Sequence, residues 1–162
     1  MRRATRIQPA GSFDASTAVD RVVLDADERH RRRIVLTGES GTKFLLDLDR
    51  AAALKDGDGL VLEDGSIVTV AGRPEPLIEI EAKSPLDLLR LAWHLGNRHT
   101  QVEIVGTKLR IRRDHVLESM VAGLGGKLTP VDAPFEPEAG AHGQGEHAHD
   151  HGHGHADHEH GA

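Results

Sequence analysis

The chain has 162 residues, with 20 Lys and Arg against 26 Asp and Glu, twelve histidines and no cysteine. Seven of the acidic residues but no Lys or Arg follow Lys127, so residues 1–127 carry 20 basic and 19 acidic groups. Such a neutral body lacks the basic surface that nucleic acid or an anionic membrane would require, and any bound metal must be held by imidazole and oxygen.

The location of the protein follows from what its sequence lacks. No stretch approaches the roughly 18 apolar residues that cross a membrane, and residues 4–16 contain no apolar run of the kind found in secretory signals. We therefore expect a soluble, cytoplasmic protein that binds neither membrane nor nucleic acid.

Residues 1–72 are predicted to form a strand-rich N-terminal domain. Short apolar runs predict strands at residues 18–23, 33–36, 43–48, 60–62 and 67–70. Asp64-Gly65 is a favoured pair for the tight hairpin between the last two. Residues 49–55 are expected to form a helical turn.

Residues 73–133 are predicted to form a second domain, entered through the rigid connector at residues 72–76. Ser84 and Pro85 begin a helix that is expected to stop at Gly96, and Asp114 begins a second helix. Strands are expected at residues 77–80, 102–105, 108–112 and 127–131. The order β-α-β-β-α-β is that of ferredoxin-like domains, and the fold class is α+β.

Residues 134–162 are predicted to be a disordered tail, because Phe135 is its only large apolar residue. It contains eight histidines: His142, His147, His149, His151, His153, His155, His158 and His160. Neutral imidazole binds Ni, Cu and Zn well, so we expect metal binding. The alternative is a solubility tail or a purification tag, although tags are normally unbroken His runs.

The first predicted helix and the loop after it contain the other candidate site. Apart from a narrow stripe of Asp87, Arg90 and His94, the helix is apolar on nearly all sides. We expect a partner to cover it, most simply a second copy of the chain. His99, just past the helix, could then lie on a two-fold axis and share an ion with its copy. On the residues alone, a loop histidine without a ligand role remains the preferred interpretation, and His94 is interpreted as a solvated residue.

The segment from Trp93 to His99, the β-α-β-β-α-β order around it, the strand-rich first domain and the His-rich end resemble the urease accessory protein UreE family. The resemblance extends over essentially the whole chain, including residues 112–117. It implies a non-enzymatic nickel metallochaperone that acts as a homodimer, in which His99 of each subunit binds one shared ion. His94 and Asn97 would support this site, and a tail histidine could add a ligand.

The resemblance also implies the cargo and the partners. Nickel, with zinc and copper as competitors, would pass through a urease GTPase accessory protein to the apo-urease maturation complex. The first domain is similar to the peptide-binding domains of chaperones. Some family members carry His-Asp-His before the second helix, where this chain has Arg113-Asp114-His115. Because Arg is not a metal ligand, an auxiliary site would rest on His115, and an exposed polar residue is an equally good interpretation.

Two other functions remain as alternatives. The first is a peptide-binding chaperone module whose tail only buffers divalent metal. The second, a metal-dependent hydrolase, is disfavoured, because a catalytic zinc site needs three protein ligands and the body offers few histidines. Residues 38–43 contain the residue types of a phosphate-binding loop, but in the wrong order, so we predict a turn there. The basic run at residues 30–33 indicates an exposed strand edge, with a docking patch as the alternative.

Overall fold

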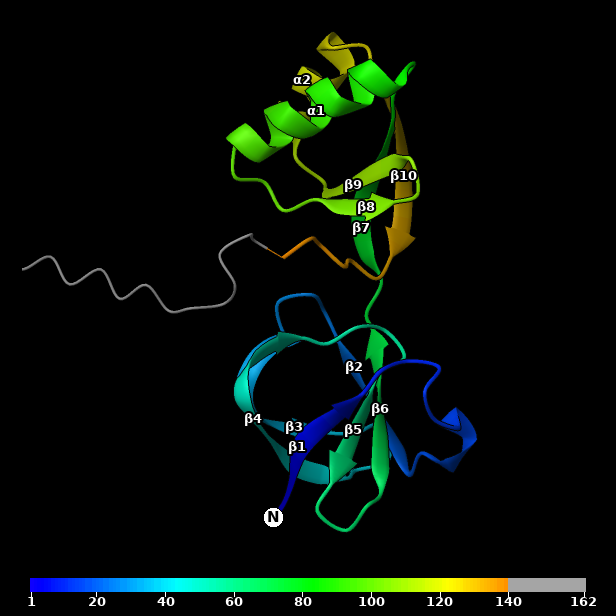
Figure 1. Ribbon diagram of the computed structural model, residues 1–162, viewed down its shortest axis with the longest axis vertical. Coiled ribbons are helices and arrows are strands. Elements are labelled where there is room, and N and C mark those ends of the chain that lie inside the picture. Colours follow the sequence, from blue (N-terminus) through cyan, green and yellow to red (C-terminus); the bar gives the residue numbers. More distant parts are fainter. Residues whose placement is uncertain (140–162) are drawn as a thin grey trace, which may run out of the picture.

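The computed structural model describes residues 1–139, which form two β-sheets and two α-helices, an α+β arrangement (Figure 1). The N-terminal half, residues 1–72, contains β1 (Arg2–Gln8), a 3-10 turn (Ala15–Thr17), β2 (Asp20–Leu24), β3 (His30–Thr37), β4 (Lys43–Ala53), β5 (Gly59–Leu62) and β6 (Ile67–Gly72). The C-terminal half, residues 75–133, contains β7 (Glu75–Glu81), α1 (Pro85–Asn97), β8 (Glu103–Val105), β9 (Lys108–Arg112), α2 (His115–Gly123) and β10 (Lys127–Ala133). Within residues 1–139, no helix is long and apolar enough to cross a membrane.

The six strands of the N-terminal half form one sheet in the order β2-β6-β5-β1-β4-β3. β1 pairs in parallel with β4 and antiparallel with β5, so it lies inside the sheet. This strand was not predicted from the sequence, because its residues are mostly polar and only Ala4 points fully into the core. The core is otherwise aliphatic, with Phe44 as its one fully buried aromatic residue.

Residues 49–55 do not form the helical turn that we expected. β4 continues to Ala53, and Ala52 and Ala53 pair with Arg31 and His30 of β3. The run of three alanines favours helix locally, but pairing along the ladder with β3 overrides that weak preference.

Residues 38–42 form the predicted turn, and a buried carboxylate organises it. Asp20 accepts backbone N–H bonds from Ser40 at 2.9 Å, Thr42 at 3.0 Å and Arg21 at 2.7 Å. A side chain at Gly38 would collide with this carboxylate, since a Cβ there would overlap its oxygen. Burial by itself would raise the pKa of Asp20, but these N–H groups lower it well below its usual range.

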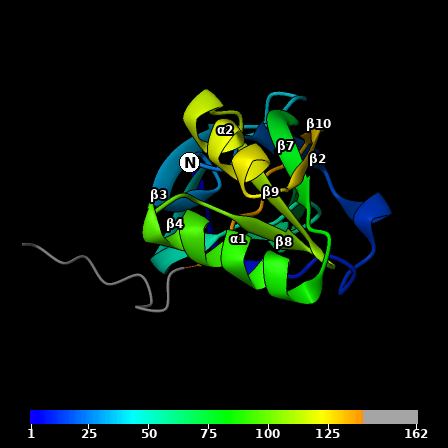
Figure 2. The ribbon, with the colours of Figure 1, turned by 90° about the horizontal axis from the view of Figure 1, so that it is seen from above.

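The C-terminal half has the element order β-α-β-β-α-β, with the strands in the order β10-β7-β9-β8. Both helices lie on the same face of this sheet (Figures 1 and 2). Its core residues are Ile78, Ile80, Leu91, Leu95, Leu109, Ile111 and Val121. The two halves therefore have separate hydrophobic cores.

The helix α1 begins as predicted but ends later than Gly96. The Ser84 hydroxyl accepts the N–H of Asp87 at 3.1 Å and Pro85 is the first helical residue. At the other end, the N–H of His99 donates to Gly96 and that of Thr100 donates to Leu95. This is the Schellman arrangement, in which the residue after the cap is left-handed. That residue is His99, and Gly96 remains inside the helix.

Residues 134–139 contradict the expectation that disorder begins at residue 134. Phe135 is fully buried, and the guanidinium carbon of Arg112 lies 5.1 Å from the centre of its ring. Pro134 packs against Gly72, where a Cβ would lie 2.5 Å from it. In Figure 1 this orange segment runs between the two halves. We call residues 134–138 the strap. The eight tail histidines lie outside the described residues.

Candidate functional site

A shallow pocket of about 380 Å³ lies where α1 ends, and His99 is one of its walls. The lining residues are Ala92, Gly96, His99, Thr100, Gln101, Val102, Ile104, Leu109 and Glu138. They come from α1, the loop after it, β8, β9 and the strap. His99 and Glu138 are both exposed to solvent, and both line this pocket.

The backbone at His99 adopts an uncommon conformation. Its φ is 55°, and within residues 1–139 it is the only residue other than glycine with a positive φ. Helices usually place glycine at this position because a side chain there costs free energy. Left-handed residues that are not glycine concentrate at functional sites, so the imidazole at this position is a candidate for a specific role.

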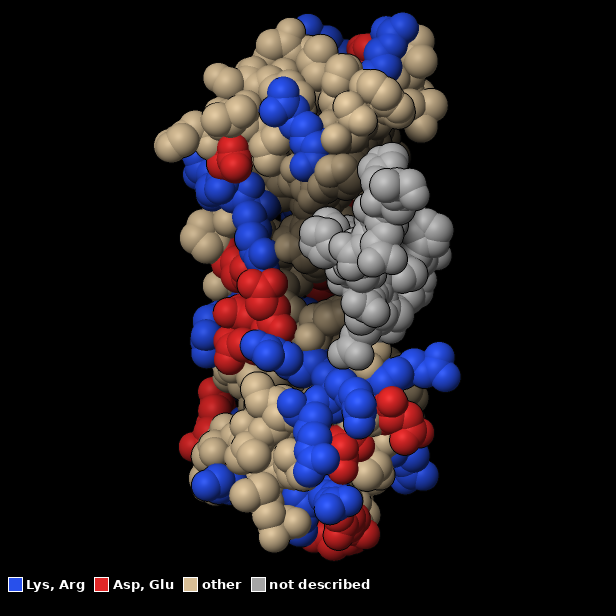
Figure 3. Space-filling view, turned by 90° about the vertical axis from the view of Figure 1, so that its left-hand side faces the viewer, with Lys and Arg blue, Asp and Glu red and all other residues tan. Residues whose placement is uncertain are grey.

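Next to the pocket, α1 presents an apolar face that no other part of residues 1–139 covers. Leu86, Leu89 and Trp93 are 54%, 68% and 65% exposed. Because Leu89 and Trp93 lie three residues from Ala92 and Gly96 respectively, this α1 apolar face continues into the pocket wall. Figure 3 shows that the upper part of the molecule on this side has few charged side chains. A contiguous apolar surface of this kind typically marks an interaction site.

The other residues proposed around His99 lie elsewhere. His94 is half-buried and packs edge-on against Trp93, with 5.0 Å between ring centres. Asn97 is exposed on the last turn of α1. Neither lines the pocket. In residues 1–139, no three His, Asp or Glu side chains come together as a metal site.

His115 is exposed at the first turn of α2, outside the pocket. Its acidic neighbours are engaged in helix capping. Asp114 accepts the N–H groups of Val116 at 2.9 Å and Leu117 at 3.0 Å. Glu118 accepts hydrogen bonds from Arg113 and from the N–H of Asp114. The geometry around His115 therefore corresponds to a capped helix start.

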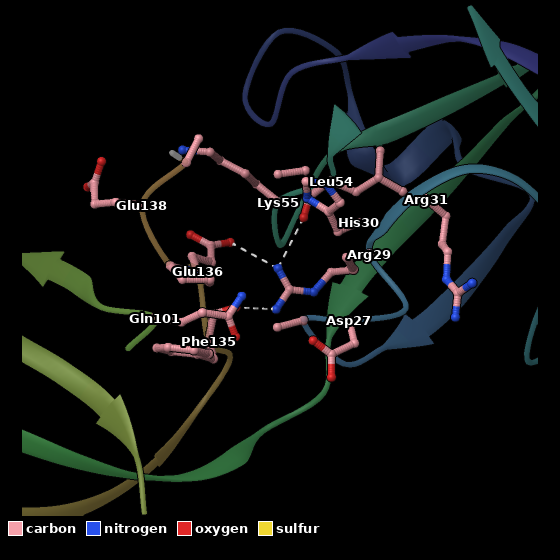
Figure 4. A pocket seen from close by; sticks show the side chains of 14 residues that line it. Asp27, Arg29, His30, Arg31, Leu54, Lys55, Gln101, Phe135, Glu136 and Glu138 are labelled. Carbon is pink, nitrogen blue, oxygen red and sulfur yellow. Dashed lines mark hydrogen bonds and ion pairs between the residues drawn. The ribbon is translucent and has the colours of Figure 1, made fainter. Parts of the chain in front are cut away.

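A larger pocket of about 590 Å³ lies between the two halves, beside the strap (Figure 4). Its central residue is Arg29, whose side chain is only 3% exposed. The guanidinium donates to the carbonyls of Phe135 at 2.6 Å, Leu54 at 3.0 Å and Leu24 at 3.2 Å. Arg29 was not predicted from the sequence, since nothing in its local surroundings distinguishes it from the exposed arginines that follow.

The strap is bonded to both halves. The carboxylate of Glu136 accepts the N–H of Asp56 at 2.8 Å, in the N-terminal half. Its backbone N–H donates to Glu103 of β8 at 3.3 Å, and the N–H of Glu138 donates to the carbonyl of Val102 at 2.8 Å. Burial raises the pKa of Glu103. The only sequence signal for the strap was the lone aromatic Phe135 in a polar stretch.

Comparison with known families covers both halves. Residues 4–72 match the model of the N-terminal domain of the UreE urease accessory protein, and residues 75–161 match that of its C-terminal domain. The chain belongs to the UreE family. As a member of this family it is an accessory protein and not an enzyme.

Relatives in several bacteria have the same family name, "Urease accessory protein UreE". The protein of Rhodopseudomonas palustris (strain HaA2) is 58% identical over 77% of this chain, and the match spans 58% of that relative's length. That of Bradyrhizobium sp. (strain ORS 278) is 53% identical over 89% of this chain and 68% of its own. That of Beijerinckia indica is 49% identical over 88% of this chain and 82% of its own.

Proposed function

We propose that the protein is a nickel metallochaperone that delivers Ni²⁺ for assembly of the urease metallocentre. The observation that carries this proposal is the placement of His99. Its imidazole is exposed at a left-handed residue, in a pocket that continues into the uncovered α1 apolar face. Membership of the UreE family supports urease as the destination.

The ion is held between two copies of the chain. One His99 is a poor site, because a structural or carried ion normally takes several ligands. A two-fold dimer through the α1 apolar face brings a second His99 to the same ion and covers Leu89 and Trp93 at once. Binding at such a site depends on protein concentration, because the dimer is what binds tightly. His94 and Asn97 flank the site on α1 rather than lining it.

The remaining assignments rest on the resemblance to the UreE family, together with the two separate cores and the composition of the tail. We assign residues 1–72 to a peptide- or partner-binding domain, and residues 73–133 to a ferredoxin-like metal-binding domain. The eight tail histidines serve as a reservoir that captures nickel, with zinc and copper as competitors. The partners are a urease GTPase accessory protein and the apo-urease complex, in the cytoplasm.

Equilibrium dialysis with nickel tests this function. The parent for the test is the full-length chain with the eight tail histidines replaced by Ser, so that the ordered strap is kept. We expect the unmodified chain to bind several ions and this parent to bind one tight ion per dimer. His99→Ala in the parent should abolish the tight site, whereas the control His30→Ala, in the N-terminal half, should leave it intact. A tight site that survives His99→Ala would refute the shared site.

A further inference from the structure

The pocket at His99 contains one acidic residue. Of the nine residues that line it, only His99 and Glu138 have side chains that commonly bind nickel, copper or zinc. Glu138 lies 39 positions after His99 in the sequence. Their shared pocket is therefore a product of the fold rather than of a local motif.

The strap determines where Glu138 lies. Its N–H is bonded to the carbonyl of Val102 at 2.8 Å, which ties it to the loop that carries His99. Three residues earlier, Phe135 is fully buried and its carbonyl accepts the Arg29 hydrogen bond. Because the backbone at Glu138 is already ordered, a ligand at this position avoids most of the entropy cost of recruiting a flexible segment.

The carboxylate of Glu138 is available, in contrast to that of Glu136. Glu136 accepts the N–H of Asp56 and lies 3.8 Å from Arg29. Within residues 1–139, no basic side chain forms an ion pair with Glu138 and no group donates a hydrogen bond to its carboxylate. Glu138 also lines the Arg29 pocket in Figure 4, where no dashed line joins it to another side chain.

The positive charge of the bound ion gives the Glu138 carboxylate a role. The proposed dimer would enclose a dication between two apolar helix faces, and two neutral imidazoles do not cancel its charge. A buried charge without a counter-charge is costly. Two copies of Glu138 supply two negative charges, so the site becomes neutral and gains the oxygen ligands that nickel accepts together with imidazole.

We propose that Glu138 of each subunit supplies a carboxylate oxygen to the ion held by the two His99 side chains. The inference rests on the proposed function, and it adds a ligand from the strap to the site. The strap would thus hold the N-terminal half, the C-terminal half and the cargo ion in one chain of contacts.

The test uses the full-length parent chain with the eight tail histidines replaced by Ser. Nickel affinity is measured by competition with a chromophoric chelator, and the dimer by sedimentation. Glu138→Gln should weaken nickel binding by at least about tenfold, the lower end of losses for groups around a metal, with dimerisation unchanged. The control Asp132→Asn removes an exposed carboxylate on β10 and should stay within about twofold of the parent.

A second variant separates ligation from general charge. Glu138→His replaces the carboxylate by another nickel ligand and should recover most of the affinity that Glu138→Gln loses. Equal affinity of Glu138→Gln and the parent would overturn the inference, and so would a Glu138→His variant as weak as Glu138→Gln. If His99→Ala also leaves the site intact, the proposed function fails as well; if only His99→Ala abolishes it, the failure is confined to Glu138.

Discussion

The two halves of the molecule have similar aliphatic cores but differ in the apolar residues that they expose at the surface. In the N-terminal half the exposed large apolar residues are Met1, Val19 and Val35, which are scattered. In the C-terminal half they are Leu86, Leu89, Trp93, Ile104, Val116 and Leu124, and three of these lie on α1. Among residues 1–139, the six-stranded half therefore exposes only isolated apolar residues, whereas the four-stranded half exposes several on one helix.

This difference follows from how each sheet is covered. The N-terminal sheet buries its apolar side chains among its own strands. The C-terminal sheet relies on α1 and α2, and α1 is apolar on two sides. Leu91 and Leu95 face the sheet, while Leu89 and Trp93 face away from it. A helix with two apolar faces requires two neighbours, and residues 1–139 supply only one.

The strap is expected to hold the two cores together, and Phe135→Ala tests this most severely. Removing a fully buried Phe typically costs about 3–5 kcal/mol, and here it would also loosen the Arg29 contacts. We expect the free energy of unfolding, measured in urea, to fall by this amount. The unfolding curve should also split into two transitions, one for each half. Phe13→Ala, at a half-buried loop residue, is the control and should cost clearly less. A single transition at the parent's position would show that the strap does not couple the halves.

The α1 apolar face is expected to be the dimer surface, and Trp93→Glu should disrupt it. A central Trp in an interface typically contributes about 2 kcal/mol or more to binding, so the dissociation constant of the dimer should rise by roughly 30-fold. Sedimentation over a concentration series measures this. Val35→Glu adds the same charge to an exposed apolar residue of the N-terminal half and should leave the dimer intact. If both variants dimerise equally, the contrast between the halves has no bearing on assembly.

Acid should weaken the N-terminal half through Asp20. Because the folded-state pKa of Asp20 is depressed, its carboxylate stabilises the fold fully above its usual pKa near 4, and this stabilisation is lost progressively as the pH falls from there toward the lower folded-state pKa. Asp20→Asn should therefore cost about 1.5 kcal/mol at pH 7, with a smaller difference from the parent at pH 3. Urea unfolding at both pH values measures this, with the exposed Asp49→Asn as control. A difference that grows in acid would contradict the assignment.

The smallest effect is expected from the ion pairs of the C-terminal sheet. Glu79 lies 2.9 Å from Arg110 and 3.2 Å from Lys108, whose hydrogen bonds lower the pKa of Glu79. These groups remain partly in contact with water, so Glu79→Gln should cost less than about 1 kcal/mol. The loss should shrink further at salt concentrations of about 1 M, because salt screens such pairs. A salt-independent loss as large as that of Asp20→Asn would show that this cluster behaves as a buried one.

The elements predicted from the sequence are those whose signals are local. Ser84 and Pro85 marked the start of α1, and Asp114 marked that of α2. By contrast, β1 and the end of β4 depend on pairing with strands that lie far away in the sequence, and their own residues are polar or helix-favouring. Such pairing overrides local preference.

The residues of the candidate site also fall into two groups, those that the sequence pointed to and those that depend on contacts between distant segments. His99 was found because its segment resembles a known family, but its left-handed backbone was not, since Gly96 was the better local candidate for a helix end. Glu138 and the strap were missed, because a short polar segment with one aromatic residue looks disordered until Arg29 and Arg112 are seen around Phe135. Contacts made by residues from both halves have no signature in the linear pattern.

The left-handed backbone of His99 also represents a trade between stability and function. A left-handed side chain costs on the order of 1 kcal/mol or more that glycine would avoid. A more stable version of this fold would therefore carry the substitution His99→Gly and have no imidazole at the pocket. Selection for stability alone would favour that exchange, and the proposed role of His99 as a nitrogen ligand would account for a histidine at this position.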